Sequence, residues 1–437
     1  MTLNYSKFVE RFSFYSLLFF VFWLPLFEGF LPTVFGIWIG FWVLEGNFKS
    51  RFRKFNFTSG LNLAFFAYFL LSLFAVLYSS NQAKAWMDVQ QKLALLVFPL
   101  LIGGLSEYSQ KNIRWAFWAF ILGLIAASIY DLAYAFQESI NAGANEGVFR
   151  YWVYEKHHHI GFLNLVNLRM SFFSYGYLSQ FMHPSYFSMY LIFAIILLYH
   201  LYKTKENTTA LSILLYASLT LFFTLLIGLL QSTAGLLSFI ALILAVIVIE
   251  FKFLNRKRIL AISVGLLAML ILGFFGSDFS GKKINDLTDT TLESLSTSTS
   301  IRMEIWKNSI ALWKENPIRG VGPADVRADI QEKLQTTMPA EFEFANFNMH
   351  NQFLESLIGL GIIGFITLCL ILFYIIKIAS RQKNSLLAYL ILIILVNFIF
   401  ESMLNRQSGL FFILFFVSLL ELYFKQNFLP KKSNIPT

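Results

Sequence analysis

Residues 300–364 read SIRMEIWKNSIALWKENPIRGVGPADVRADIQEKLQTTMPAEFEFANFNMHNQFLESLIGLGIIG and form the largest polar stretch of an otherwise apolar chain. The stretch holds a short-range set of basic side chains: Arg302, Arg319, Arg327 and His350. It lies between two apolar runs, each long enough to be a membrane-spanning segment. We therefore expect the other helices to hold this segment at one face of a membrane, where its basic residues can meet an anionic ligand.

The composition is typical of a polytopic all-α membrane protein. Of 437 residues, 57% are hydrophobic, 18% are aromatic and only 14% are charged, and the mean hydropathy is +0.63. A soluble domain of this length exposes far more charge. In a membrane protein the net charge of +9 reflects loop topology and does not indicate a nucleic-acid partner. The single cysteine, Cys369, excludes an intrachain disulfide.

Hydropathy predicts about twelve transmembrane helices. They lie near residues 12–31, 33–45, 61–78, 93–105, 115–137, 184–201, 210–229, 235–251, 259–276, 353–377, 385–401 and 409–424. The second and fourth runs are shorter than the roughly 20 residues that cross the hydrocarbon. The predicted organisation is residues 1–276 with nine helices and an external loop at 138–183, residues 277–352 as a large periplasmic loop, and residues 353–437 with the last three helices and a short cytoplasmic tail.

The distribution of basic residues predicts the orientation. The two termini and alternate loops together carry 20 of the 34 lysines and arginines and only six acidic residues. Positive charge concentrates in cytoplasmic loops. Both termini are therefore predicted to be cytoplasmic, which places the two long loops on the outer face.

Two short helices are predicted within the second long loop. The spacing of Trp306, Ile310 and Trp313 predicts an amphipathic helix over 301–316, ended by Asn316-Pro317 and lying at the membrane interface. A second helix is predicted to begin at Pro323, with residues 326, 330 and 334 on one face.

The run from Asn316 to Pro323, NPIRGVGP, predicts a tight turn that leads into the second helix. Backbone N–H groups in such turns and at helix N-termini attract anions. Together with Arg302 and Arg319 the turn is therefore a candidate phosphate or diphosphate site that includes Gly320 and Gly322. The alternative is that the glycines only form a turn and that the arginines meet lipid headgroups.

His350 is predicted to lie where the chain re-enters the membrane. The positive end of a helix dipole favours uncharged imidazole, which a general base requires. Asn351 and Glu355 are four residues apart and are spaced to share one helix face with each other. The alternative is an interfacial histidine that merely caps the helix. Gly359, Gly361 and Gly364 predict a close helix-packing surface.

In order, the motifs R-x3-W, N-P-x-x-G-x-G, H-N-x-x-L-E and G-x-G-x-x-G resemble the O-antigen ligase and Wzy-type polymerase superfamily. The residues that carry the resemblance are Arg302, Trp306, Asn316, Pro317, Gly320, Gly322, His350, Asn351, Leu354, Glu355, Gly359, Gly361 and Gly364. The predicted topology, with a large external loop late in the chain, is similar to that of the family. The resemblance covers the last third of the chain best.

This resemblance implies a glycosyltransferase of a bacterial inner membrane that takes part in surface-polysaccharide or lipopolysaccharide biosynthesis. The donor would be an undecaprenyl-diphosphate-linked glycan, and the acceptor a hydroxyl of lipid A core, protein or another glycan. Arg302 would bind the diphosphate, with Arg319 as a weaker candidate, and His350 would be the base or would orient the acceptor. Asn351, Glu355, Gly320 and Gly322 would line the substrate site. No metal or other cofactor is expected.

Two upstream segments are similar to the family less closely. Arg169, within RMSFFSYGYLSQFMHPSYFSMY, is another candidate anion contact, and His183-Pro184 either lines the site or simply starts a helix. Many members have a Ser-Arg-Gly-like turn where this chain has Gln231 to Gly235 without an arginine. That departure puts in doubt how the diphosphate is bound, and Arg169 or Arg406 are candidates to compensate.

Other functional classes fit the sequence less well. The triplet of histidines at 157–159 cannot converge on one ion, so a metal site is not predicted. Asp131 and Glu28 are ionisable residues within or near predicted spans and are minor candidates for function. A transporter or a flippase for lipid-linked oligosaccharides also fits twelve spans, but no repeat relates the two halves. A Wzy-type polymerase would use the same chemistry as a ligase.

Overall fold

The computed structural model describes residues 2–46, 48–104, 110–144, 172–173, 175–205, 207, 209–250, 298–337 and 348–428. Within these residues every regular element is a helix, which confirms the all-α prediction. The predicted span at 259–276 and most of the loop at 138–183 lie outside the described residues. So do residues 277–297 and 338–347 of the second long loop.

Six of the described helices are long and apolar enough to cross a membrane. They are Gln82–Gly103, Lys111–Glu138, Pro184–Lys203, Ala210–Leu230, Gln352–Arg381 and Gln407–Lys425, and shorter apolar helices lie at Glu28–Leu44, Gly60–Ala75, Thr233–Val248 and Ser385–Phe400. Several predicted boundaries were wrong. The first helix ends at Trp23 rather than near 31, and residues 82–92, predicted as a connection, are helical and lead into the fourth predicted span.

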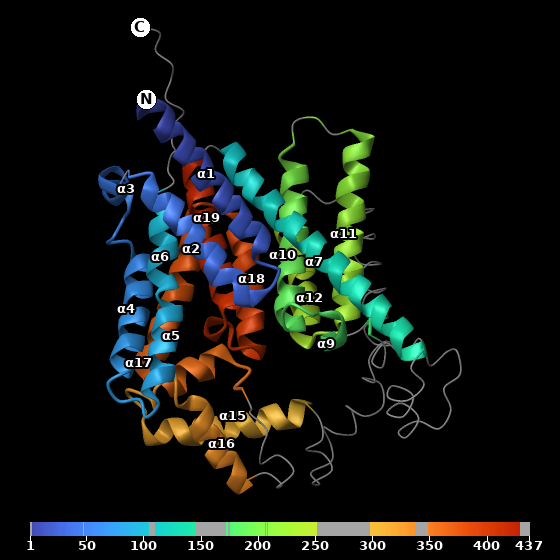
Figure 1. The fold of residues 1–437 in the computed structure, drawn as a ribbon. Coiled ribbons are helices and arrows are strands. Elements are labelled where there is room, and N and C mark those ends of the chain that lie inside the picture. Colours follow the sequence, from blue (N-terminus) through green and yellow to red (C-terminus); the bar gives the residue numbers. More distant parts are fainter. Residues whose placement is uncertain are drawn as a thin grey trace. The chain divides into compact units, whose positions relative to one another are not determined.

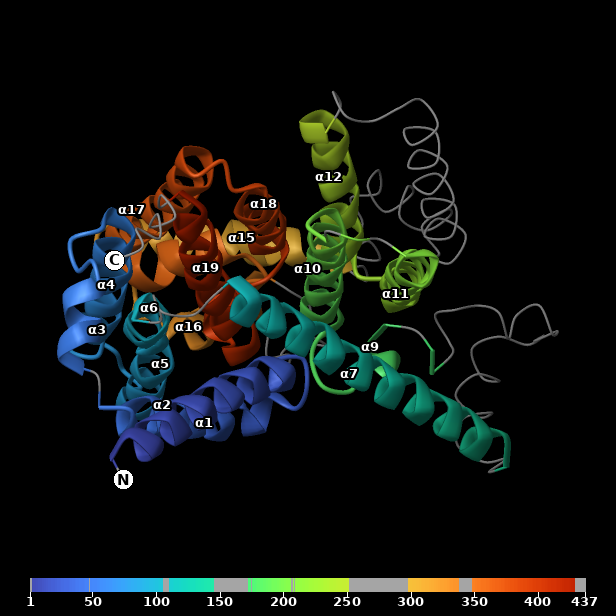
Figure 2. The same cartoon turned by 90° about the horizontal axis from the view of Figure 1, so that it is seen from above.

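The helices form two compact units, and the larger one contains residues 1–20, 31–116 and 295–437. Its helices are α1 (Thr2–Trp23), α2 (Leu31–Leu44), α3 (Phe48–Lys54), α4 (Gly60–Ala75), α5 (Gln82–Lys92), α6 (Ala94–Gly103), α15 (Ser298–Glu315), α16 (Val326–Thr337), α17 (Gln352–Arg381), α18 (Ser385–Phe400), η7 (Met403–Asn405) and α19 (Gln407–Phe428). In Figure 2, α19 lies between α6 and α18, and it packs against both. The first 20 residues and the last helices of the chain therefore share one folding unit.

An aromatic cluster forms part of the core of this larger unit. The ring centroids of neighbouring residues in this cluster lie 5.2 to 6.4 Å apart, and the residues are Phe20, Trp38, Phe98, Phe411 and Phe415. All five side chains are buried. Aromatic side chains bury large areas and pack in tilted arrangements of this kind. The phenylalanine-rich composition thus ties α1, α2, α6 and α19 together.

The second unit contains residues 21–30 and 117–294. It holds η1 (Glu28–Phe30), most of α7 (Gln110–Ala144), α9 (Tyr175–Leu178), α10 (Pro184–Lys203), α11 (Ala210–Leu230) and α12 (Thr233–Glu250). Helix α10 packs against both α11 and α12, and most of its side chains are buried. A helix that is apolar on all sides belongs in the interior of a bundle, so α10 is the central helix of this unit.

Short polar residues start several helices of the larger unit. The side chains of Ser59, Asn81, Asn351 and Asn384 each accept a hydrogen bond from a backbone N–H in the first turn of α4, α5, α17 and α18. Such caps satisfy donors that have no partner inside the helix. Where the sequence places serine or asparagine just before an apolar run, the helix therefore begins at the next residue.

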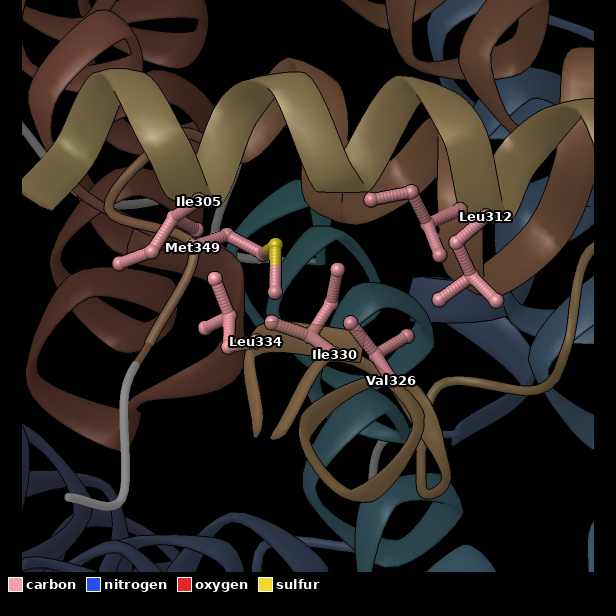
Figure 3. Packing of buried hydrophobic residues seen from close by; sticks show 7 residues of the cluster. Ile305, Leu312, Val326, Ile330, Leu334 and Met349 are labelled. Atoms are coloured by element: carbon pink, nitrogen blue, oxygen red, sulfur yellow. The ribbon is translucent and has the colours of Figure 1, made fainter. Parts of the chain in front are cut away.

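The loop helices α15 and α16 pack on each other and on the start of α17. Figure 1 shows them crossing the ends of the longer helices of their unit. The buried cluster that joins them comprises Ile305, Leu312, Val326, Ile330, Leu334, Met349 and Ile358, and Figure 3 shows these side chains converging between the two helices. The predicted face of the second helix is confirmed, although α16 begins at Val326 rather than at Pro323.

The predicted apolar face of the first loop helix was wrong by about one residue. Helix α15 ends at Glu315, as predicted, but its buried hydrophobic residues, among those described, are Ile305 and Leu312. Ile310 is exposed, and Trp306 and Trp313 are only partly buried. Neighbouring helical residues differ by 100°, so the two tryptophans lie beside the core and use their indole N–H groups for hydrogen bonds. These go to the carbonyls of Met349 at 3.0 Å and Pro317 at 3.1 Å.

Candidate active site

Hydrogen bonds to Asp325, in the turn before α16, connect the loop that carries α15 and α16 to the rest of its unit. Its carboxylate accepts hydrogen bonds from the hydroxyls of Ser79 and Ser80 and from the backbone N–H of Ser80, each at 2.8 Å, and from the N–H of Asn81 at 3.1 Å. Burial raises the pKa of Asp325, but these hydrogen bonds outweigh it and hold the pKa below the ordinary value. A carboxylate with four donors fixes the start of α16 to the turn between α4 and α5.

The turn from Pro317 to Gly322 pairs with a break in α17. The N–H groups of Val321 and Gly322 donate to the carbonyls of Ile358 and Gly359, at 2.9 and 3.0 Å, and the N–H of Ile362 donates back to Pro317 at 2.9 Å. Gly361 is non-helical, with φ of 66°. Residues 317–322 therefore replace helix hydrogen bonds that the break in α17 removes.

Glycine is required at this junction for close approach. A Cβ on Gly361 would lie 2.1 Å from the carbonyl oxygen of Ile318, and a Cβ on Gly320 would lie 2.3 Å from that of Ile358. Both residues also have positive φ. The N–H groups of residues 320 to 322 all donate to protein carbonyls. This agrees with the alternative in which the glycines only form a turn, because these three N–H groups are already used. A role of Gly320 and Gly322 in binding substrate stays a prediction.

His350 lies at the end of the loop beside a buried carboxylate. Its Nδ1 is 3.3 Å from Oε2 of Glu401, the residue that ends α18. The side chain of His350 is 29% exposed, and that of Glu401 is 4% exposed. A carboxylate at Nδ1 fixes the imidazole tautomer and orientation and leaves Nε2 as an acceptor. This arrangement gives His350 the geometry of a general base that a second residue orients.

Two further α17 side chains hold the segment that follows Glu401. Gln352 accepts from the N–H of Leu404 at 2.7 Å. Glu355 accepts from the hydroxyl of Ser402 at 3.1 Å and from the amide of Asn405 at 2.8 Å. Glu355 is 6% exposed, so it belongs to the support of the site rather than to its surface. Its predicted role in binding substrate has no direct observation behind it.

Asn351 is the N-cap of α17. Its Oδ1 accepts from the N–H of Leu354 at 3.0 Å, and the residue is largely buried. His350, immediately before it, has φ of 47°, a conformation that only a few per cent of non-glycine residues adopt and that is most common in functional or turn positions. Asn351 thus starts the helix that directly follows His350. A contact between Asn351 and substrate stays a prediction.

Arg302 lies on α15, one turn before Trp306, and is partly buried. Residues four apart lie on the same side of a helix. The indole of Trp306 bonds the carbonyl of Met349, which is adjacent to His350. Trp306, one turn after Arg302, therefore joins α15 to the segment that carries His350. A joint role of Arg302 and His350 stays a prediction.

Arg319 is exposed and lies elsewhere in the loop. Its guanidinium carbon is 5.2 Å from the ring centroid of Tyr78, whose hydroxyl donates to the Arg319 carbonyl at 2.7 Å. This is a cation–π contact that holds the turn against the end of α4. Arg169, the other predicted anion contact, lies outside the described residues.

In the second unit, three features singled out in the sequence make local hydrogen bonds. His183 caps α10, with its Nδ1 accepting from the N–H of Ser185 at 3.3 Å, which is the simpler of the two interpretations. Ser232, in the turn that lacks the family arginine, donates to the hydroxyl of Ser185 at 3.1 Å. Asp131 is buried and accepts from the N–H of Gln180 at 3.2 Å.

The metal prediction is not tested by the structure. Residues 157–159 lie outside the described residues. In the part of the chain that the structure describes, no group of three His, Cys, Asp or Glu side chains is arranged to hold an ion.

Sequence reasoning missed the partner of His350 and the anchor of the loop. Glu401 is 51 residues away from His350 in the sequence, and Asp325 binds residues about 245 positions earlier. For Glu401 one signal was present, because a carboxylate that ends an apolar run is rare unless it has a partner. Lys92, buried in α5, also interacts electrostatically with Glu355 and was not singled out.

Comparison with known proteins bears on the same loop. Residues 216–369 match the family model described as O-antigen ligase, and this range includes Arg302, Arg319, His350, Asn351 and Glu355. An uncharacterized protein of Haemophilus influenzae is similar to the chain, with 25% identity over 234 residues. The alignment covers 50% of this chain and 58% of that protein, so the chain spans somewhat more than half the length of its relative.

The family match and the apolar helices agree on the broad class of the protein. Several helices are long and apolar enough to cross a membrane, and the matched range contains the motifs on which the resemblance was drawn. The resemblance is therefore confirmed. The chain is a multi-pass membrane protein whose residues 216–369 are similar to the O-antigen ligase family.

Proposed function

We propose that this protein transfers a glycan from an undecaprenyl-diphosphate carrier onto the hydroxyl of an acceptor, as a surface-polysaccharide ligase. The observation that carries the proposal is the pair formed by His350 and Glu401, 3.3 Å apart. His350 lies at the end of a folded loop whose sequence matches the O-antigen ligase family, and Glu401 follows α18, beyond the matched range. A carboxylate-oriented imidazole is suited to remove a proton from a hydroxyl.

In the proposed reaction, Nε2 of His350 accepts the proton of the acceptor hydroxyl. The hydroxyl oxygen forms a bond to the anomeric carbon of the donor sugar, while the bond from that carbon to the phosphate oxygen breaks. The diphosphate leaves with the electron pair and stays attached to the lipid. Glu401 holds the ring during this step and stabilises the imidazolium that forms.

Positive charge has to be available where the leaving group gains negative charge. Arg302 is our candidate for this role, because its helical turn is joined to the His350 segment through Trp306. A guanidinium binds phosphate oxygens in a bidentate manner. Arg319 is a second, weaker candidate. Since a diphosphate is already a good leaving group, we propose that positioning and charge supply the catalysis without a metal, and that EDTA leaves the rate unchanged.

The same proposal includes an orientation in the membrane. The distribution of basic residues supports a cytoplasmic location for both termini, with residues 277–352 forming the large loop on the periplasmic side of a bacterial inner membrane. A single-cysteine variant at Met303, which is 60% exposed, tests the orientation. A membrane-impermeant thiol reagent added to spheroplasts should label it. Labelling only after the membrane is opened would place the loop in the cytoplasm.

Transfer itself is tested with purified protein in lipid nanodiscs, a lipid-linked glycan and a hydroxyl acceptor. Wild-type protein should form product and free carrier diphosphate in equal amounts. The R302A variant should lower kcat/KM for the donor by about tenfold, as expected for the loss of about 1.4 kcal/mol from a charge-assisted hydrogen bond. R302K retains the charge and should be intermediate. Absence of product with every donor and acceptor class would reject the function.

A Wzy-type polymerase is the alternative within the same chemistry. The two differ in the acceptor, which is lipid A core or protein for a ligase and another lipid-linked glycan for a polymerase. Glycan profiles of a deletion strain separate them. Loss of all attached glycan indicates a ligase, whereas retention of a single repeat unit indicates a polymerase.

A further inference from the structure

Glu355 uses both carboxylate oxygens to hold the chain that follows α18. Oε2 accepts from the hydroxyl of Ser402 at 3.1 Å, and Oε1 accepts from the amide of Asn405 at 2.8 Å. One turn earlier on α17, Gln352 accepts from the N–H of Leu404 at 2.7 Å. Three residues of one short segment are therefore bonded to two side chains of a single helix face.

That segment is continuous with the residue that faces the imidazole. Glu401 ends α18 and is covalently joined to Ser402, and its Oε2 lies 3.3 Å from Nδ1 of His350. His350 lies two residues before the start of α17, the helix that carries Glu355. The 401–405 segment and the start of α17 are therefore linked twice, once by the buried hydrogen bonds and once by the His350–Glu401 pair.

We propose that Glu355 is a positioning residue that fixes residues 402–405 against α17, so that the carboxylate of Glu401 stays within reach of Nδ1 of His350. The expected effect of Glu355 on the rate of transfer rests on the proposed function, whereas its expected effect on the position of residues 402–405 does not. It gives Glu355 a role through Glu401, in place of the predicted contact with substrate.

The surroundings of Glu355 offset part of the cost of burying its carboxylate. Burial opposes its negative charge, whereas the hydrogen bond from Ser402 and the positive charges of Arg327 on α16 and Lys92 on α5 favour it, and Asp88 opposes it. Burying a carboxylate is costly unless its oxygens are hydrogen-bonded and its charge is compensated. Arg327 comes from the loop and Lys92 from α5, so the loop helices also contribute to the support of Glu355.

Side-chain replacements separate this role from mere loss of structure. Alanine removes both hydrogen bonds. Glutamine keeps an acceptor for the Asn405 amide and supplies an N–H that can donate to the Ser402 hydroxyl, which serves as donor or acceptor. We therefore expect E355A to lower kcat by about 10- to 100-fold, the range typical of residues that orient a functional group without contacting the substrate. E355Q should restore kcat to within about threefold of wild type.

The decisive comparison pairs Glu355 with Glu401. If Glu355 acts through Glu401, the E355A/E401Q double variant should be about as slow as E401Q alone, because changes that disable one unit are not additive. Donor KM should stay within about twofold in E355A, since the lost interaction serves the chemical step. The matched control is E315A, which removes a carboxylate that pairs with Lys333 on the surface of the loop. Multiplying effects of E355A and E401Q would overturn the inference.

A second readout does not depend on catalysis. Hydrogen–deuterium exchange of the peptide that spans residues 402–405 should be faster in E355A than in wild type, E355Q or E315A. Unchanged exchange in E355A would also overturn the inference. If wild-type protein transfers no glycan, the proposed function fails, while the exchange experiment still decides whether Glu355 fixes this segment.

Discussion

The glycine turn at 316–322 and His350 were both predicted parts of a functional site, but their hydrogen-bonding groups have different partners in the structure. In the turn, the N–H groups of residues 320 to 322 all bond to protein carbonyls. At His350, Nδ1 faces Glu401, and among the described residues Nε2 has no protein partner. A polar motif whose hydrogen bonds are complete supports packing, whereas one with an unused acceptor at a partly exposed position is suited to chemistry.

The largest effect on activity among supporting residues is expected for E401Q. Glutamine keeps the size of the side chain but removes the charge that stabilises an imidazolium at His350. We expect kcat to fall by about 100-fold or more, the scale of general-base contributions, with donor KM nearly unchanged. Transfer assays in nanodiscs at several donor concentrations measure both constants. A parallel rise in KM would instead point to Glu401 contacting the donor.

The largest effect on stability is expected for G361A. The new Cβ would clash with the Ile318 carbonyl, and the residue would keep a positive φ that alanine adopts poorly. We expect a loss of about 2–4 kcal/mol in the free energy of unfolding from strain and overpacking. G36A is the matched control, because a Cβ at Gly36 meets nothing within 4 Å. Equal thermal unfolding of the two variants in detergent would show that the junction with α17 tolerates change.

A smaller effect, with a pH signature, is expected for D325N. Its pKa is held below the ordinary value, so its ionised form adds stability above the usual carboxyl pKa of about 4. This contribution is lost as the pH falls through the lowered value. D325N should lose about 1.5–3 kcal/mol at neutral pH, as for hydrogen bonds to charged groups, and wild type should approach the variant below about pH 4.

Asp329 provides the control with the opposite sign. Burial, followed by the negative charges of Asp325, Glu332 and Glu315, raises its pKa. The ionised form of Asp329 is therefore disfavoured in the folded protein, and D329N should be neutral or slightly stabilising at neutral pH. Thermal unfolding of both variants between pH 3 and 7 distinguishes the two aspartates. Destabilisation by D329N at neutral pH would contradict the assignment.

The smallest effect is expected for R319A. The exposed contact between Arg319 and Tyr78 is worth about 0.5–1 kcal/mol, and the helices on either side are held by other bonds. If Arg319 also meets the diphosphate, the donor KM should rise in R319A and recover in R319K. Y78F is the control, because phenylalanine keeps the ring but removes the hydroxyl that donates to the Arg319 carbonyl. If Y78F raises the donor KM as much as R319A does, the positive charge of Arg319 is not the cause.

Local features of the fold followed from the sequence, and contacts between distant residues did not. The end of α15 before Pro317 and the buried face of Val326, Ile330 and Leu334 reflect proline chemistry and helical periodicity. The break at Gly361 was read as a packing surface, because a glycine pattern does not reveal positive φ. Arg302 and His350 were found by motif, whereas no local pattern determines which carboxylate will meet the imidazole.

The most direct test of the account compares wild-type and H350A protein in a single-turnover transfer assay with bound lipid-linked glycan and saturating acceptor. The account predicts that H350A binds the donor as wild type does but forms product about 100- to 10,000-fold more slowly, the range of general acid–base catalysis. Product formation by H350A at the wild-type rate would show that His350 is not the base.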